Sequence, residues 1–309
     1  MSHALRPRTI AYLTLPPLLW ASNAIVGRLS VSGGAPLVSP LMLNCVRWAV
    51  MLLLLAPIVW VSARRTPGAP SLAAVVRRDW RIFLAFGVLA VASYNSLQYM
   101  ALKTSSAINV TLIAASGPLF SLVLGRLFFG ENAHVRAWLG AALSLAGVVV
   151  VLTEGEAARL AGLRFVPGDL LMIVATVVWS LYSWLLRRHR PDLPVLAFLL
   201  LQTGFGVVIA VPLVGAEWLA GDFVLVLSAA TLAVVLWVAT GPSFVAYWCW
   251  DRGVAEAGPL LPMFFANLTP FFAALMSAAL LREPPHAFHG LAFLLIVGGI
   301  VVAQWRRPR

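Results

Sequence analysis

The sequence predicts an all-α integral membrane protein, with ten transmembrane helices arranged as two inverted five-helix repeats around a central cavity. Three observations lead to this prediction. About 61% of the 309 residues are hydrophobic and only 11% are charged, whereas a soluble domain carries roughly 25% charged residues. The apolar residues are gathered in long blocks. A pattern of residues in the first half also recurs in the second half at a nearly constant spacing.

The apolar blocks have the length of membrane-spanning helices. A bilayer core about 30 Å thick needs roughly 20 residues of helix, whereas barrel strands would alternate in segments of about ten residues. We predict ten helical blocks, at residues 10–28, 38–61, 81–101, 106–129, 135–153, 168–186, 194–214, 229–250, 258–281 and 287–305. The loops between them are short, so any function has to reside among the helices.

Two broken apolar segments reveal the repeat. Residues 114–131 read AASGPLFSLVLGRLFFGE and residues 266–283 read ANLTPFFAALMSAALLRE. Each segment has polar residues before an internal proline and ends on a glutamate. A spacing of 152 residues joins four pairs: Pro118 with Pro270, Glu131 with Glu283, His134 with His286, and Gly147 with Gly299.

Further pairs extend the repeat to the other helices. The first helix reads WASNAIVGR from Trp20, and the sixth reads WSLYSWLLR from Trp179. Pro57 pairs with Pro212, which places Arg47 opposite Gln202. We predict two units of five helices, at residues 1–155 and 156–309. A second copy of an odd-numbered unit must cross the membrane in the opposite orientation, and such inverted repeats are typical of transporters that work by alternating access.

Prolines inside the apolar blocks predict kinks. A proline removes one backbone hydrogen bond from a helix, and in a membrane the freed carbonyl needs another partner. Ser116 and Thr269 are placed to supply one. We predict hinges beside the cavity at residues around three prolines, namely Gly117, Pro118, Gly241, Pro242, Thr269 and Pro270. The alternative is that these kinks only shape helix packing.

The net charge of +11 is distributed as a topology signal. Basic residues flank the apolar blocks, which is typical of membrane proteins with positively charged cytoplasmic loops and argues against a nucleic-acid partner. With a cytoplasmic N-terminus, the inner segments hold roughly fifteen basic residues and the outer segments five. One lysine accompanies about 21 arginines, which is typical of a GC-rich bacterial gene. We predict a bacterial inner-membrane protein with both termini in the cytoplasm.

Several motifs combine into a family pattern. They are LLWASNAIVGR in the first helix, Arg47 in the second, ALKTSSAINVTLI followed by GPLF, and the glutamates that close the fourth and ninth helices. This combination resembles the EamA branch of the drug/metabolite transporter superfamily over nearly the whole chain. The resemblance implies an inner-membrane carrier with cytoplasmic termini, often an exporter of amino acids or related metabolites. The tryptophan and tyrosine content is similar to that of YddG-type aromatic amino-acid exporters.

Ionisable residues deep in a membrane are costly and usually functional. Asp169, Asp251, Glu131 and Glu283 lie near the ends of the blocks, and the five histidines lie at block ends or in loops. A proton-coupled carrier usually needs a titrating group in the middle of the membrane. We therefore predict facilitated diffusion or exchange, with a proton-driven efflux carrier of drugs or other metabolites as the alternative.

Arg47 is the one charge predicted to lie within the hydrocarbon region. Its guanidinium could bind the carboxylate of a substrate. Alternatively, the side chain could reach outward to the membrane surface, or hydrogen-bond backbone carbonyls and the helix of Gln202.

Aromatic and amide side chains supply the other polar groups of the blocks. Tyrosine and tryptophan combine a broad apolar face with one hydrogen-bond donor, which suits a cavity for neutral or zwitterionic molecules with apolar side chains. For each residue alone, core packing is the alternative. The predicted substrate-binding residues are Trp20, Asn23, Arg47, Tyr94, Gln98, Tyr99, Trp179, Tyr182, Tyr247, Trp248 and Asn267.

Other function classes have little support in the sequence. It contains no G-x-S-x-G or H-E-x-x-H motif, so we predict no enzyme, catalytic residue, metal or cofactor. Cys45 and Cys249 fall inside helices and are interpreted as packing residues. A channel or a non-transporting scaffold is the remaining alternative. The predicted partners are a small-molecule substrate and the lipid bilayer, and both a monomer and a homodimer stay open.

Overall fold

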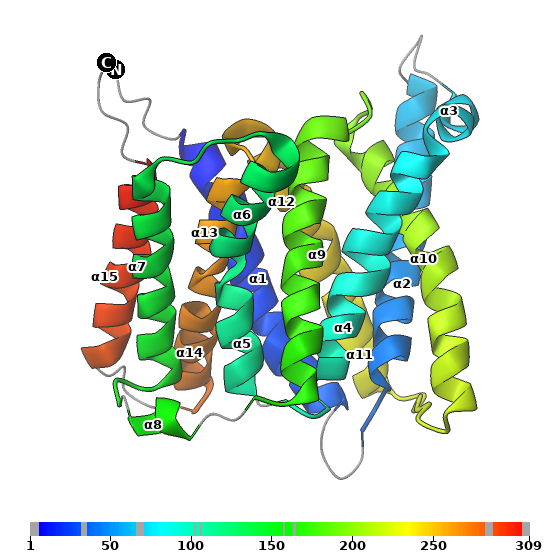
Figure 1. The fold of residues 1–309 in the computed structure, drawn as a ribbon. Helices are drawn as coiled ribbons and strands as arrows, with labels where there is room; N and C mark the ends of the chain where they lie inside the picture. The colour runs from blue at the N-terminus through cyan, green and yellow to red at the C-terminus, as the bar shows by residue number, and fades with distance from the viewer. Residues whose placement is uncertain are drawn as a thin grey trace.

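The computed structural model describes residues 6–31, 36–65, 71–101, 103–105, 107–156, 158–162, 165–281 and 287–304. They form an all-helical bundle (Figure 1). The one β contact among these residues is an isolated antiparallel bridge between Val38 and Leu225. Glu283 and His286, two members of the sequence repeat, lie outside the described residues.

Each of the ten predicted apolar blocks corresponds to one helix or to a run of helices. Six blocks are single helices: α1 (Pro7–Val31), α2 (Pro40–Arg65), α7 (Val135–Leu152), α9 (Pro167–His189), α10 (Val195–Leu219) and α15 (Ala287–Gln304). The other four are runs: α3 (Leu72–Phe86), η1 (Gly87–Ser93) and α4 (Tyr94–Ala101); α5 (Ala107–Ala115) and α6 (Gly117–Phe129); α11 (Ala229–Val238), η2 (Ala239–Val245) and α12 (Ala246–Ala257); α13 (Leu260–Ala266) and α14 (Leu268–Leu281). The short α8 (Ala158–Ala161) lies before α9. The predicted ten-helix architecture is confirmed.

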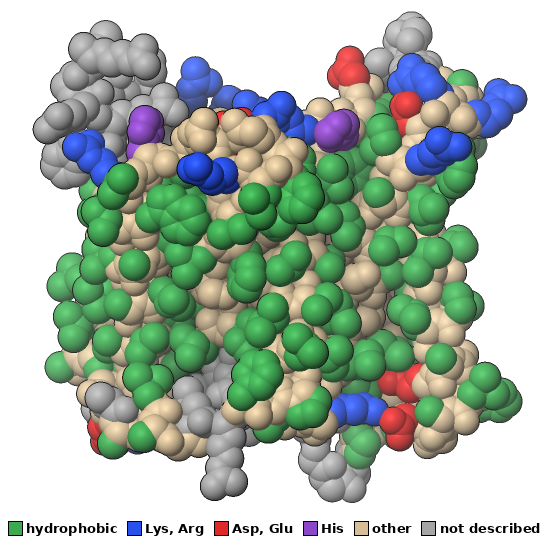
Figure 2. Space-filling model, in the orientation of Figure 1, with side chains coloured by type: hydrophobic (Ala, Val, Ile, Leu, Met, Phe, Trp, Pro, Cys, Tyr) green, Lys and Arg blue, Asp and Glu red, His purple; other side chains and the backbone are tan. Residues whose placement is uncertain are grey.

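The surface of the bundle is that of a membrane protein. Six of the described helices or continuous helical runs are long and apolar enough to cross a bilayer, and shorter apolar helices accompany them. Large hydrophobic side chains are widely exposed, for example Leu127, Phe128 and Leu294. Figure 2 shows apolar side chains over the middle of one face, while most of the visible Lys and Arg gather along the edge that carries the termini in Figure 1. The chain is therefore a multi-pass membrane protein.

The spacing found in the sequence recurs in the helix boundaries. The two π-helical segments η1 and η2 are each seven residues long, and they begin 152 positions apart, at Gly87 and Ala239. Helices α7 and α15 begin and end at the same spacing. Counterpart helices thus change geometry at counterpart residues. The boundary between the two units, at residues 155 and 156, stays a prediction.

Helices α7 and α15 are counterparts that lie side by side (Figure 1). Their backbones approach closely at two glycines. A Cβ atom added to Gly140 would lie 2.5 Å from the carbonyl oxygen of Gly299, and one added to Gly299 would lie 2.6 Å from that of Gly140. Small residues permit this approach, which is a common basis of helix packing in membranes.

A buried carboxylate joins a second pair of counterpart helices, α2 and α10. Glu217 of α10 is 5% exposed and accepts hydrogen bonds from the Ser39 hydroxyl at 2.6 Å and from the backbone N–H groups of Leu41 and Met42 at 3.0 Å each. A negative charge at a helix N-terminus interacts favourably with its unpaired N–H groups. Both oxygens of Glu217 are thus used to cap α2.

We expect Gly299→Ala to destabilise the bundle by about 1–3 kcal/mol, the usual cost of overpacking. The new Cβ would meet backbone atoms of Gly140 and Ser144 at 2.6 and 2.7 Å, and backbone cannot move aside as a flexible side chain can. The measurement is thermal denaturation of the purified protein in detergent. Gly290→Ala is the matched control, because it lies on the same helix with nothing within 4 Å of the new Cβ. Equal melting temperatures for the two variants would contradict this packing.

Candidate functional site

Arg47 is the centre of a buried polar cluster inside the bundle. The side chain belongs to α2, is 1% exposed and points inward. Its Nε donates to the Ser243 hydroxyl of η2 at 2.9 Å. Its Nη1 donates to the Asn95 side-chain oxygen at 3.4 Å and to the Tyr99 hydroxyl at 3.1 Å, both on α4. The guanidinium also lies 5.0 Å from the ring centre of Trp48.

The positive charge of Arg47 has only neutral partners among the described residues. Every ion pair within 4.0 Å in this part of the chain involves other cations, such as Arg188 with Glu131 and Lys103 with Asp222. The side chain therefore does not reach outward to the membrane surface, and its hydrogen bonds go to side chains of η2 and α4 instead of backbone carbonyls or the helix of Gln202. A buried cation without a counter-ion is costly, and it can be compensated by an anionic ligand.

The irregular backbone of η2 creates one of the Arg47 partners. Pro242 lacks an N–H, so the carbonyl of Val238, four residues earlier, loses its usual helical partner. The Ser243 hydroxyl donates to this carbonyl at 2.8 Å while it accepts from Arg47. The indole N–H of Trp20 donates to the Pro242 carbonyl at 3.1 Å. The break at Gly241 and Pro242 thus links α1, α2 and η2.

A cluster of aromatic rings lies next to the Arg47 partners. The ring of Trp179 on α9 packs against Trp20, Tyr94, Tyr182, Tyr247 and Trp250, with centroid distances of 5.5, 4.9, 5.1, 5.3 and 5.0 Å. Tyr247 joins the two groups, because its hydroxyl accepts from Asn95 at 3.4 Å and its ring lies 4.7 Å from that of Trp48. Polar and aromatic residues from both halves therefore meet in one place.

Three of the predicted cavity residues form no hydrogen bond with the Arg47 cluster. Asn267 donates to Ser144 of α7 at 2.9 Å, so it joins helices at the α7 side of the bundle. Trp248 packs edge-on against Tyr12 of α1 at 5.6 Å. Gln98 is half-buried and makes no hydrogen bond with the other described residues. Asn23 does join the Arg47 cluster, since its side-chain nitrogen donates to the Tyr99 hydroxyl at 3.4 Å.

The other predicted hinge residues lie at breaks between short helices. Helix α5 ends at Ala115 and α6 begins at Gly117, with Pro118 in its first turn. Helix α13 ends at Ala266 and α14 begins at Leu268, so Thr269 and Pro270 fall in the first turn of α14. The Ser116 hydroxyl and the Ser116 backbone N–H both donate to the carbonyl of Ile113, at 2.5 and 3.1 Å. The role of these residues as hinges stays a prediction.

Asp251 lies at the end of its predicted apolar block, but its side chain is buried. It belongs to the middle of α12 and is 0% exposed. Its Oδ1 accepts from the Tyr182 hydroxyl at 2.9 Å, and its Oδ2 has no hydrogen-bond partner among the described residues. Helices α1, α9 and α13 contact α12, and the linear sequence does not show this packing. The argument for facilitated diffusion relied on position along the block alone.

Sequence reasoning missed Ser243, Trp48 and Trp250 of the site, and it also missed the buried Asp251 outside the Arg47 cluster. Two of them carried a usable signal. Ser243 directly follows the helix-breaking Pro242, where a hydroxyl can compensate a freed carbonyl. Asp251 follows Tyr247 by four residues, which places both on one face of a helix.

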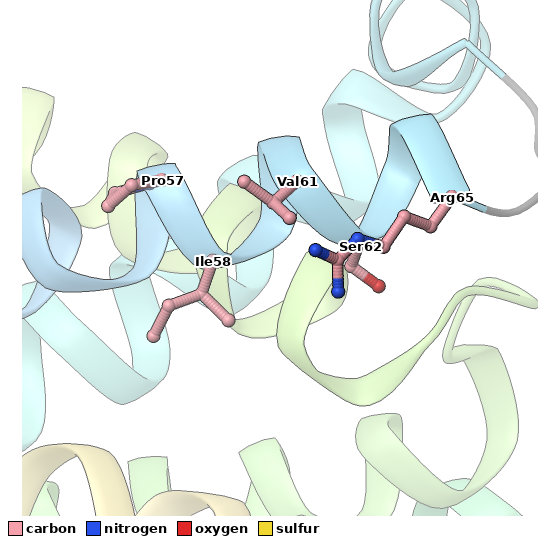
Figure 3. A pocket seen from close by; sticks show the side chains of 5 residues that line it. All are labelled: Pro57, Ile58, Val61, Ser62 and Arg65. Carbon is pink, nitrogen blue, oxygen red and sulfur yellow. The ribbon is translucent and has the colours of Figure 1, made fainter.

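The buried cation and the neighbouring aromatic rings can together bind a small molecule. Among the described residues, no group of three or more His, Cys, Asp or Glu side chains could hold a metal ion. A surface groove on α2, lined by Pro57, Ile58, Val61, Ser62 and Arg65, lies apart from the site (Figure 3). All five of its side chains come from one helix and are exposed.

A comparison with protein families identifies the chain. The chain matches the EamA-like transporter family over residues 8–153 and again over residues 166–304. The chain belongs to this family. As an EamA-like protein it is a membrane transporter, which confirms the resemblance found in the sequence.

Named relatives are also transporters. The chain is 27% identical over 241 residues to the aromatic amino acid exporter YddG of Ancylobacter novellus, which covers 74% of this chain and 77% of that protein. It is 26% identical over 235 residues to the uncharacterized transporter YyaM of Bacillus subtilis, covering 74% of each. A solved crystal structure with 24% identity covers 96% of both chains at a TM-score of 0.73, which shows a shared fold.

We expect Ser243→Ala to destabilise the protein by about 1–3 kcal/mol, because removal of one buried partner leaves the other groups unpaired. The substitution takes a hydrogen bond from both Arg47 and the Val238 carbonyl. Thermal denaturation in detergent measures the effect. Thr240→Ala is the control, since Thr240 lies in the same π-helical segment but is exposed. A Ser243 variant as stable as the Thr240 variant would show that the hydroxyl is not needed.

Proposed function

We propose that this chain is an alternating-access carrier of the bacterial inner membrane that exports small zwitterionic metabolites, above all neutral and aromatic amino acids. The observation that carries the proposal is Arg47, a buried cation with neutral partners next to a cluster of aromatic rings. The relative named as an aromatic amino acid exporter supports the substrate class.

The geometry around Arg47 fits a carboxylate. Its contacts to Asn95 and Tyr99 are to neutral oxygens at 3.4 and 3.1 Å. A carboxylate can accept two parallel hydrogen bonds from a guanidinium, and this bidentate geometry adds both energy and specificity. A bound carboxylate would also neutralise the buried charge, which the present neutral partners do not.

The aromatic cluster fits the remainder of such a substrate. Trp20, Trp179 and Tyr247 come from α1, α9 and α12, so they line the region from both halves of the chain. Aromatic rings pair well with apolar or aromatic side chains in edge-on or offset arrangements. A site with one charge and several rings selects molecules that have a carboxylate and an apolar group.

Alternating access and orientation belong to the same proposal. Irregular backbone next to a binding site is typical of transporters with internal repeats. In this chain the irregular backbone consists of η1, η2 and the helix breaks before Pro118 and Leu268. Basic side chains gather on the edge that carries the termini (Figure 2), which supports cytoplasmic termini by the positive-inside rule.

We expect Arg47→Gln to raise the KM for phenylalanine by about 10- to 100-fold, because a hydrogen bond to a charged group contributes about 1.5–3 kcal/mol. The measurement is counterflow of radiolabelled phenylalanine in proteoliposomes. In the wild type, phenethylamine, which lacks the carboxylate, should compete poorly with phenylalanine. In the Arg47 variant, the two compounds should compete more equally.

Arg126→Gln is the matched control, because Arg126 is exposed on α6 and its loss should leave the KM unchanged. Unchanged selectivity in the Arg47 variant would refute a carboxylate at this position. Unsaturable flux in the wild type would instead favour a channel over a carrier.

A further inference from the structure

We propose that Asp251 is a proton-binding residue through which this carrier is coupled to a proton gradient. The proposal rests on the carrier function proposed above and adds a second ligand, the proton, at a site distinct from Arg47. The proton would add to the Oδ2 oxygen, which converts the carboxylate into a neutral carboxylic acid, and would leave from the same atom.

The burial of Asp251 is the first argument. Its side chain is 0% exposed, and only one of its two oxygens has a hydrogen-bond partner, the Tyr182 hydroxyl. An isolated buried carboxylate is far more costly than a paired one. Two other buried carboxylates, Glu217 and Asp169, have partners on both oxygens, for Asp169 the Ser105 hydroxyl and the Val166 N–H. Asp251 therefore differs from Glu217 and Asp169, whose carboxylates accept hydrogen bonds on both oxygens.

Unpaired polar atoms near Asp251 form the second argument. Gln202 of α10 lies close to the Tyr182 hydroxyl, yet both polar atoms of its amide are buried without a hydrogen-bond partner among the described residues. The Nε of Arg190, between α9 and α10, is also buried and unpaired there. Natural proteins leave few such atoms. Here Gln202 lies on α10 and Arg190 joins α9 to α10, and both helices contact α12, so hydrogen bonds in this region can rearrange when the charge of Asp251 changes.

Arg190 is the cation that can respond when Asp251 gains or loses a proton. Its charge acts on Asp251, but no ion pair within 4.0 Å joins the two described side chains. Instead, Nη2 donates to the Leu193 carbonyl at 3.2 Å, and the guanidinium lies 5.3 Å from the ring centre of Phe198. This arrangement fits a protonated Asp251. Loss of the proton would draw the guanidinium towards the carboxylate and alter the junction of α9 and α10.

The other ionisable groups around Asp251 do not occupy its free oxygen. On α9, Tyr182 contacts Oδ1. On α12 itself, Arg252 lies 5.8 Å from the Trp248 ring centre, Cys249 is a free buried thiol, and the Tyr247 hydroxyl donates to the Ala90 carbonyl. Glu256 is held by Thr9 and Arg8 of α1. The described parts of η2 and α13 contain no ionisable side chain.

The repeat supplies a third argument. The spacing that pairs Trp20 with Trp179 also pairs Asn23 with Tyr182, and the spacing of 152 pairs Tyr99 with Asp251. The structure contains both corresponding contacts, Asn23 to Tyr99 at 3.4 Å and Tyr182 to Asp251 at 2.9 Å. The two polar clusters are thus counterparts. One contains the cation Arg47, and the other contains the anion Asp251.

A mechanical link joins the two clusters. Tyr247 is one helical turn before Asp251 on α12 and contacts Asn95 of the Arg47 cluster. A substrate at Arg47 and a proton on Asp251 would therefore act on the same helix. This geometry provides a route by which one ligand can affect the binding of the other.

The first test is a pH titration of the purified protein by infrared difference spectroscopy, which detects the C=O stretch of a protonated carboxyl group. We expect a buried-carboxyl band that changes with pH in the wild type and disappears in Asp251→Asn. Asp169→Asn is the matched control and should keep the band, because both Asp169 oxygens have hydrogen-bond partners. A spectrum of Asp251→Asn identical to the wild type would overturn the proposal.

The second test measures transport in proteoliposomes with radiolabelled phenylalanine. In the wild type, a pH gradient should drive phenylalanine against its concentration gradient. Asp251→Asn should lose this accumulation by at least about tenfold but keep exchange of phenylalanine at equal pH. Wild-type exchange that is indifferent to a pH gradient would overturn the coupling. If the wild type does not exchange phenylalanine at all, the substrate proposal fails, and the infrared titration still decides whether Asp251 binds a proton.

Discussion

The placement of one positive charge, that of Arg47, constrains much of the bundle around it. A guanidinium that is withdrawn from water needs several partners to remain inside a membrane protein. Here the partners come from η2 and α4, and the Trp48 ring lies beside the charge. These contacts hold α2 against the irregular segments of the third and eighth helices. The same charge lacks an anion, so the group that organises the interior is also the group best suited to bind a ligand.

The irregular backbone is concentrated where such partners are available. Within a membrane, a break in a helix is tolerated only if protein groups or water satisfy the freed carbonyl. Ser243 does this at η2. By contrast, α7 and α15 are continuous helices that meet through closely packed glycines. The bundle thus combines a tightly packed pair of helices at one side with adaptable helices around the site.

The two halves share geometry but have diverged in chemistry. The π-helical segments begin at counterpart residues, and the contact of Asn23 with Tyr99 has a counterpart in that of Tyr182 with Asp251. However, each charged residue of these two clusters has an uncharged counterpart in the other half. Arg47 stands opposite Gln202, and Asp251 stands opposite Tyr99. An inverted repeat therefore places a cationic cluster and an anionic cluster in related surroundings, connected through α12.

The sequence by itself determined the membrane class, the ten helices and the repeat, because these depend on block length, composition and spacing along the chain. It also indicated Arg47, Tyr99, Trp179 and Tyr247, since polar and aromatic residues inside apolar blocks stand out locally. Only the tertiary structure decided which residues share a site. Asp251 lies near the end of its block and is buried by other helices, whereas Asn267 lies deep in its block and contacts α7 instead. Burial and contact depend on how helices pack against one another, and that packing is set by side chains far apart in the sequence.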